Sequence, residues 1–114
     1  MQEYNWVYML GCADNTIYVG MSNNVQKRFE QHKNKTARCK FTRRKDKHPL
    51  KLIAYWKVYG KIGNAIKVEI FIKRGKRKRK DLLLKNPEIL EELFYEAKKE
   101  KISIENYFNG GEFY

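Results

Sequence analysis

The pattern of hydrophobic and polar positions along the chain begins with short apolar runs that are separated by polar turn residues. Residues 6–11 (WVYMLG) and 16–20 (TIYVG) are rich in β-branched and aromatic types, which predicts two strands. The polar residues around Asp14 supply the turn of a hairpin. A third run of this kind, residues 49–58, begins at a proline and predicts a third strand.

The register of this hairpin determines where its two tyrosines point. A two-residue turn would place Tyr8 and Tyr18 on opposite faces of the sheet, because side chains alternate along a strand. A three- or five-residue loop centred on Asp14 would instead pair Leu10 with Tyr18 and place both tyrosines on one face. The pattern alone leaves both geometries open.

A helical period follows the hairpin. In SNNVQKRFEQHKN, Val25, Arg28, Phe29 and His32 recur at positions i, i+3, i+4 and i+7, after serine and asparagine residues suited to capping. At about 100° per residue these four positions fall within one arc of the helix. Arg28 and His32 are therefore expected on the buried side, where a cation needs a partner or a function.

Two structures are compatible with the segment AIKVEIFIKR, residues 65–74. Its alternation of apolar and polar residues is typical of a strand, with Glu69 a solvated surface carboxylate. As a helix beginning near Gly63, the same segment would turn Glu69 inward, one turn from Lys73. Only the second arrangement makes Glu69 a candidate for a site.

The C-terminal third combines charge, a helix signal and aromatic residues. Residues 73–81 are the densest basic cluster, and Asn86–Pro87 opens a predicted helix. We expect an α+β fold with a small three-stranded antiparallel sheet flanked by helices. Residues 1–80 would form its core, and residues 81–114 a helical extension and an aromatic tail (101–114) packed on the same domain.

The composition points to a polyanionic partner. Of 114 residues, 42% are hydrophobic, which argues against disorder, and 25 Lys+Arg against 13 Asp+Glu leave a formal net charge of +12. Nucleic acid is the first expectation, with an anionic membrane surface the weaker alternative and a merely solubilising surface the simplest one. No apolar run approaches the ~20 residues needed to cross a bilayer.

The two cysteines and the N-terminus indicate an intracellular protein. Cys12 and Cys39 are far apart and form no pair typical of zinc sites, so we expect two free thiols in a reducing cytoplasm. The N-terminus lacks the pattern of a secretory signal. A cytoplasmic, nucleoid-associated location follows as an expectation, with DNA as the partner and a protein partner left open.

Five residues of the chain resemble the motifs of the GIY-YIG nucleases, in particular small members related to the N-terminal nuclease domain of the bacterial excision-repair endonuclease. WVY, which contains Tyr8, stands where the family has its first motif, and YVG, which contains Tyr18, stands for the second. GMSNNVQKRFEQH matches the family's glycine–serine–arginine–histidine spacing through Arg28 and His32. The resemblance covers roughly residues 5–80, with a tryptophan in place of the first-motif glycine.

This resemblance implies a metal-dependent endonuclease that cuts DNA to leave 5′-phosphate and 3′-hydroxyl ends. It also favours a helix around Glu69, which would hold one Mg²⁺ or Mn²⁺ ion. A motif tyrosine would be the general base, with Tyr18 slightly favoured over Tyr8. Arg28 would stabilise the charge on the phosphate, and His32 would either assist proton transfer or hold Tyr8.

The basic residues near these motifs are expected to contact the DNA backbone. They are Lys27, Lys40, Arg43, Arg44, Lys73, Arg74, Lys76 and Arg77, and the hydroxyl of Ser22 is expected to join them. The family points to branched or damaged DNA and to DNA repair, although the sequence does not decide between DNA and RNA. The alternative function is a non-catalytic basic nucleic-acid-binding module on the same scaffold, and a basic protein-interaction domain is a third.

Overall fold

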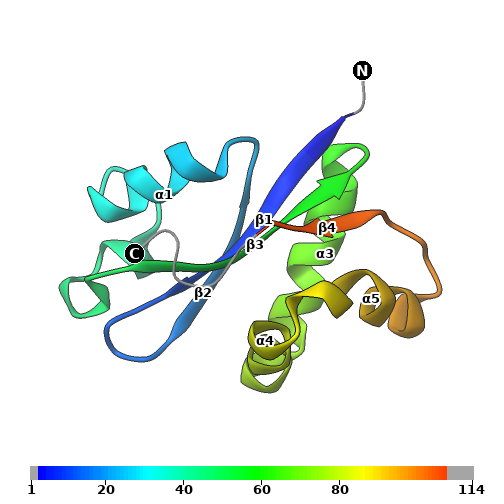
Figure 1. The fold of residues 1–114 in the computed structure, drawn as a ribbon. Coiled ribbons are helices and arrows are strands. Elements are labelled where there is room, and N and C mark those ends of the chain that lie inside the picture. Colours follow the sequence, from blue (N-terminus) through cyan, green and yellow to red (C-terminus); the bar gives the residue numbers. More distant parts are fainter. Residues whose placement is uncertain (1–2, 108–114) are drawn as a thin grey trace.

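Four antiparallel strands form the central layer of the computed structural model, which describes residues 3–107. The strands are β1 (Tyr4–Gly11), β2 (Ile17–Ser22), β3 (Lys51–Tyr59) and β4 (Ile104–Asn106), in the order β2-β1-β3-β4 (Figure 1). The α+β class is confirmed, but the predicted number of three strands is wrong. The end of the expected aromatic tail, residues 108–114, lies outside the described residues.

The fourth strand is short, and tertiary contacts stabilise it. Its three residues pair with β3, with Ile104 opposite Val58. Ile102 just before it is buried in the main core, and the backbone N–H of Ile104 donates to a carboxylate oxygen of Glu91 at 2.7 Å. Because these contacts depend on a distant helix, three residues of local pattern could not predict the strand.

The hairpin adopts the register that places both tyrosines on one face. Leu10 lies opposite Tyr18, and Tyr8 lies opposite Gly20, with a five-residue loop centred on Asp14. In this loop a carboxylate oxygen of Asp14 accepts hydrogen bonds from the backbone and the hydroxyl of a threonine two residues on, at 3.2 and 2.6 Å. The odd-numbered loop predicted as one alternative is therefore confirmed.

Helices cover both faces of the sheet. On one side lie α1 (Val25–Lys33), α2 (Lys40–Arg43) and the 3₁₀ turn η1 (Lys45–Lys47). On the other lie α3 (Ile62–Arg74), α4 (Lys76–Lys85), the 3₁₀ turn η2 (Pro87–Ile89) and α5 (Leu90–Lys98) (Figure 1). Among residues 3–107, no helix is both long and apolar enough to span a membrane.

The ambiguous segment around Glu69 is helix α3, as the resemblance favoured. Its buried positions, Ala65, Val68 and Ile72, follow the helical period and face the sheet. The strand-like alternation came from Ile66 and Ile70, which are about two-fifths exposed on the outer side of the helix. Tertiary packing therefore outweighs the β propensity of these residues, which amounts to a fraction of a kcal/mol each.

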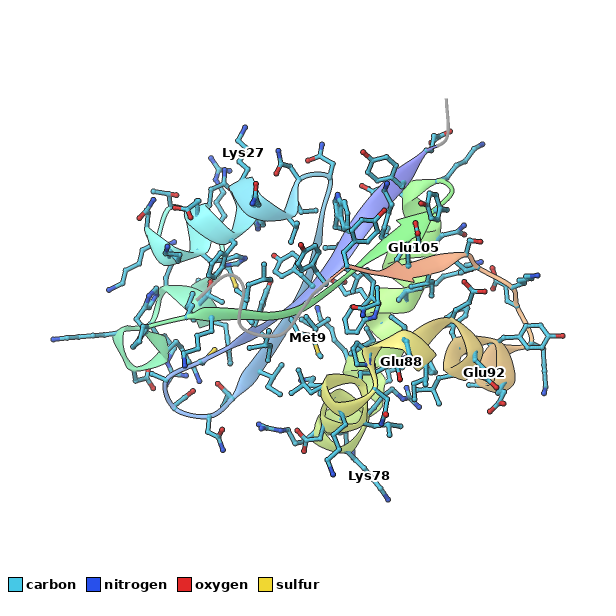
Figure 2. All side chains as sticks on the ribbon, in the orientation of Figure 1. Met9, Lys27, Lys78, Glu88, Glu92 and Glu105 are labelled. Atoms are coloured by element: carbon cyan, nitrogen blue, oxygen red, sulfur yellow. The ribbon has the colours of Figure 1, made fainter. Side chains whose placement is uncertain are left out.

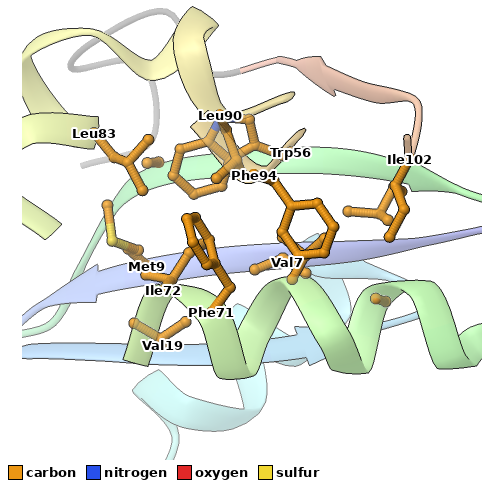
Figure 3. Packing of buried hydrophobic residues seen from close by; sticks show 14 of the residues in the cluster. Val7, Met9, Val19, Trp56, Phe71, Ile72, Leu83, Leu90, Phe94 and Ile102 are labelled. Atoms are coloured by element: carbon orange, nitrogen blue, oxygen red, sulfur yellow. The ribbon is translucent and has the colours of Figure 1, made fainter. Parts of the chain in front are cut away.

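The main hydrophobic core lies between the sheet and helices α3, α4 and α5 (Figure 3). Leu83, Leu90 and Phe94 are almost completely buried there, together with Trp56 of β3. The indole N–H of Trp56 donates to the backbone oxygen of Pro87 at 2.7 Å. Residues from the C-terminal third thus share one core with the strands.

A second, smaller cluster lies on the opposite face, beneath α1. Val25 and Phe29 of that helix pack there against Tyr8 and Leu10 of β1. β2 lies at one edge of the sheet. Side chains from the two faces of the sheet can therefore approach one another around this edge. This second face carries most of the predicted catalytic residues.

An ion pair between Lys47 and Asp14 connects the basic loop of residues 35–48 to the hairpin. Lys47 is buried, and its Nζ lies 2.5 Å from a carboxylate oxygen of Asp14 and 4.1 Å from the ring centroid of Phe41. The hydrogen bond from Lys47 lowers the pKa of Asp14 to about 2. Phe41 in turn stacks on Tyr18, with ring centroids 5.9 Å apart. The loop is therefore held beside the second tyrosine.

Candidate active site

A hydrogen-bonded chain of three buried side chains links β1, α1 and α2. The hydroxyl of Tyr8 lies 2.9 Å from Nε2 of His32, and Nδ1 of His32 lies 2.7 Å from the hydroxyl oxygen of Thr42. Each of the three side chains is at most 1% exposed. The sequence predicted His32 on the buried side of its helix, and the structure confirms that position.

The Thr42 hydroxyl also lies 3.5 Å from the backbone oxygen of Cys39. A neutral imidazole has one N–H, so one ring nitrogen of His32 donates in this chain and the other accepts. Burial, with the charge of Arg28 next, lowers the pKa of His32 to about 4, so the ring is neutral at neutral pH.

Arg28 lies next to Tyr8 and is half-buried. Its Nη1 donates to the side-chain oxygen of Gln31 at 3.2 Å, and its guanidinium is also hydrogen-bonded to the Tyr8 hydroxyl. Burial raises the pKa of Tyr8 to about 12, although Arg28 acts in the opposite direction. The cation that the sequence placed on the buried side thus has two partners, and Tyr8 remains a protonated phenol.

Tyr18 occupies the more open side of the same cluster. Its ring centroid lies 6.3 Å from that of Tyr8 and 5.3 Å from that of His32. Burial raises its pKa, and a hydrogen bond to the thiol of Cys39 acts in the same direction. Tyr18 is half-buried, whereas Tyr8 is almost completely buried, so Tyr18 is the tyrosine that a substrate can reach.

Glu69 approaches this cluster from α3. Its side chain is 18% exposed, and one carboxylate oxygen lies 3.6 Å from Nζ of Lys73, one turn along the helix. Its negative charge contributes to the raised pKa values of both Tyr8 and Tyr18. The carboxylate therefore belongs to the same electrostatic neighbourhood as the two tyrosines.

The position opposite Tyr8 in β2 accepts only glycine. A Cβ on Gly20 would lie 2.5 Å from the hydroxyl oxygen of Tyr8 and 2.9 Å from a ring carbon of Tyr18. The absence of a side chain is therefore what lets the two phenol rings converge over this strand.

Gly20→Ala is expected to destabilise the fold by about 1–3 kcal/mol, because the new methyl group displaces two packed rings. Chemical denaturation measures this change. The control is Gly63→Ala, where an added Cβ meets nothing within 4 Å and the helix gains about 0.5–1 kcal/mol. Equal stability of the Gly20→Ala protein and the unmodified chain would show that the rings do not depend on this glycine.

The donor set suits a hard divalent cation held mainly by water and phosphate. Within residues 3–107, no group of three or more histidine, cysteine, aspartate or glutamate side chains is placed to hold a metal. Mg²⁺ commonly takes one or two carboxylates and completes its shell with waters and substrate oxygens. Glu69, a carboxylate beside the tyrosines, fits that requirement as a single protein ligand.

Two of the predicted DNA-contacting residues lie directly beside Arg28. Ser22 and Lys27 line a surface hollow together with Arg28, Gln31 and Ile62. The hydroxyl of Ser22 also bonds with the backbone N–H and oxygen of a residue in the turn before α1, both at 3.1 Å. Lys27 points away from the sheet (Figure 2).

The remaining basic residues form two groups at some distance from Arg28. Lys40, Arg43 and Arg44 lie on and after α2, where Arg44 pairs with Asp46 at 2.8 Å. Lys73, Arg74, Lys76 and Arg77 lie on α3 and α4. Arg77 bonds with Asp81 at 2.9 Å and with the backbone of the hairpin loop at 2.5 Å, and Arg74 lines a separate hollow with residues of α5.

The sequence reasoning missed three residues of the cluster. Gln31 stands three residues after Arg28, and this spacing on a helix predicts contact. Thr42, on the short helix α2, and Cys39, directly before it, carry no such signal, since the position of this segment is set by tertiary contacts.

The sequence of this chain matches known proteins over most of its length. The family model for the GIY-YIG catalytic domain matches residues 4–82, which include both tyrosines, Arg28, His32 and Glu69. A UPF0213 protein of Limosilactobacillus reuteri is 39% identical over 82 residues, covering 72% of this chain and 83% of that protein. A GIY-YIG domain-containing protein of Invertebrate iridescent virus 6 is 40% identical over 88 residues, covering 75% and 85%.

Among solved structures, the chain is similar to a UPF0213 protein of Bacillus halodurans determined by NMR in solution. The two are 25% identical with a TM-score of 0.47, and the match covers 73% of this chain and 84% of that one. The expected family is thus confirmed by the sequence matches, which span well over half of the chain. The chain belongs to the GIY-YIG family and to the UPF0213 group of proteins.

Proposed function

We propose that this protein is a metal-dependent endonuclease that hydrolyses phosphodiester bonds of DNA. One observation carries the proposal: Tyr8, Tyr18, Arg28 and His32 converge on one face, and the charge of Glu69 acts on both tyrosines. A module that only binds nucleic acid has no need for a carboxylate whose charge acts on two phenols in a basic protein.

Arg28 is suited to stabilise the charge that develops on the phosphate. Its guanidinium is held by Gln31 on one side and by Tyr8 on the other, and His32 holds Tyr8 in turn. A planar group with five N–H donors retains free donors after making these bonds. The buried chain therefore positions a cation that also lines the hollow shared with Ser22 and Lys27.

Tyr18 is the proposed general base. Tyr18 would first lose its own proton to solvent. As water attacks, its oxygen bonds to phosphorus and its proton passes to the Tyr18 phenolate, while the bond to the 3′ oxygen breaks and that oxygen takes a proton from solvent, which leaves a 5′-phosphate and a 3′-hydroxyl. Burial keeps Tyr18 protonated, and the carboxylate of Glu69 adds to its raised pKa. Neutralising the charge of Glu69 removes one cause of the raised pKa of Tyr18 and so favours the phenolate, the form that can accept a proton from water.

Glu69 would hold one Mg²⁺ or Mn²⁺ ion. When bound, such an ion supplies positive charge that polarises the phosphate and lowers the pKa of neighbouring acids.

The proposal is tested by incubating the protein with supercoiled plasmid and with branched DNA, in Mg²⁺, in Mn²⁺ and in EDTA. We expect nicks with 5′-phosphate and 3′-hydroxyl ends in either metal and none in EDTA. Branched or damaged DNA is the first substrate class to test, because the family includes an excision-repair nuclease domain, and RNA of matched sequence serves as comparison. Binding without cleavage under all these conditions would favour the non-catalytic module.

A further inference from the structure

Five aromatic side chains gather on the part of the sheet that α1 leaves uncovered. We call Tyr4, Trp6, Tyr55, Tyr59 and Tyr107 the aromatic platform. Trp6 is its centre, with ring centroids 5.9, 5.6 and 5.1 Å from those of Tyr4, Tyr55 and Tyr107. Tyr4 and Tyr107 are 41% and 40% exposed. Such an exposed cluster of large rings is uncommon on a surface without a binding function.

The charges on the platform balance one another. Nζ of Lys57 lies 4.2 Å from the ring centroid of Tyr4 and 5.4 Å from those of Tyr59 and Tyr107. Glu105 lies opposite Lys57 in the strand register and accepts hydrogen bonds from the hydroxyls of Tyr59 and Tyr107. A locally neutral surface of rings and polar tips suits a nucleobase better than a phosphate group.

The platform forms one wall of a slot that leads toward the candidate active site. The slot is lined by Tyr4, Trp6, Tyr55 and Tyr107 on one side and by residues 23–26, at the start of α1, on the other. Asn23 and Asn24 also line the hollow that contains Lys27 and Arg28. One strand of nucleic acid could therefore contact both surfaces.

We propose that the aromatic platform binds an unpaired base of the DNA strand whose phosphates pass Lys27 and Arg28. Stacking on Tyr and Trp rings needs a base free of its duplex, and it tolerates any sequence, because every base has a π face. The protein therefore selects DNA with a single-stranded segment beside the bond to be cut. This inference rests on the proposed nuclease function for the identity of the strand, but its binding step needs no catalysis.

The test is fluorescence anisotropy with a labelled single-stranded dT 12-mer and a blunt 12-base-pair duplex, in EDTA to prevent cleavage. The double variant Tyr4→Ala/Tyr107→Ala removes the two most exposed rings of the platform. We expect it to bind the dT 12-mer about tenfold more weakly than the unmodified chain, with duplex binding unchanged. The matched control is Tyr95→Ala, which removes a tyrosine that is 49% exposed on α5.

The salt dependence separates stacking from a loss of charge. The double variant should keep the slope of log Kd against log salt. Lys27→Ala should reduce that slope by the amount expected for the loss of about one phosphate contact. Equal binding of the dT 12-mer by the double variant and the unmodified chain would overturn the inference, as would an equal loss in Tyr95→Ala.

The two proposals can fail independently. A protein that nicks plasmid normally but shows no ring-dependent binding of the dT 12-mer retains the nuclease proposal and loses the platform. A protein that binds the dT 12-mer through the platform but never nicks DNA retains the platform as a single-strand-binding surface of a non-catalytic module.

Discussion

Glu69→Gln is expected to reduce DNA cleavage by at least about 1,000-fold, which corresponds to about 4 kcal/mol of transition-state stabilisation. Glutamine keeps the size and shape of the side chain but removes the charge that binds a hard cation. The ion pair with Lys73 is long at 3.6 Å, and its lysine is half-exposed, so the free energy of unfolding should change by less than about 1 kcal/mol. Single-turnover cleavage of supercoiled plasmid in Mg²⁺ measures the first effect, and chemical denaturation the second.

Glu100→Gln is the matched control for this change. Glu100 pairs with Lys67 of helix α3 at 2.8 Å, and its side chain is 42% exposed. Its replacement removes the same charge and should leave cleavage within about twofold, because exposed ion pairs contribute little. If Glu69→Gln cut as fast as the unmodified chain, Glu69 would not be the metal ligand and the proposed mechanism would be wrong.

The hairpin shows what local pattern can determine. Period-two alternation in β1 and β2, with a polar loop around Asp14, predicts two paired strands. It reduces their register to two alternatives, one of which placed Tyr8 and Tyr18 together. The choice depended on the conformation of the loop, in which a hydrogen bond from Thr16 to Asp14 stabilises the five-residue form.

Helix α3 and strand β4 show where local pattern is insufficient. Ile66 and Ile70 create a strand-like alternation, yet they face outward because the sheet binds the other side of the helix. In β4, three residues make few backbone hydrogen bonds, and Ile102 and Ile104 are fixed by packing on the core. Both outcomes depend on contacts between segments that are remote in sequence, which periodicity does not contain.

The environment of the candidate site was harder to predict than its members. Spacing and resemblance named both tyrosines and Arg28, but they do not give the pKa of a phenol in the folded protein. Burial raises the pKa of Tyr8 to about 12 despite the hydrogen bond from Arg28. Burial depends on the packing of α1 and the basic loop against the sheet, and a linear sequence does not give that packing.

Arg28→Lys is expected to lower the rate of cleavage by about 100-fold while changing the Kd for DNA by less than about threefold. Lysine keeps the positive charge, so the attraction of the phosphates remains. It lacks the planar fork of donors that bonds with Tyr8 and Gln31 and still presents N–H groups to the phosphate. The measurement is single-turnover cleavage at saturating protein, with Kd from anisotropy in EDTA.

Arg43→Lys provides the comparison for this variant, because it makes the same exchange on α2. At that position only the positive charge is expected to contribute to DNA binding. It should leave both the rate and the Kd within about twofold. A loss confined to Arg28→Lys would mean that fixed donor geometry, and not the net charge of +12, accelerates the reaction. If both variants cut at the rate of the unmodified chain, Arg28 would act only by attracting the DNA, and the chain of Tyr8, His32 and Thr42 would stabilise the fold without orienting a catalytic group.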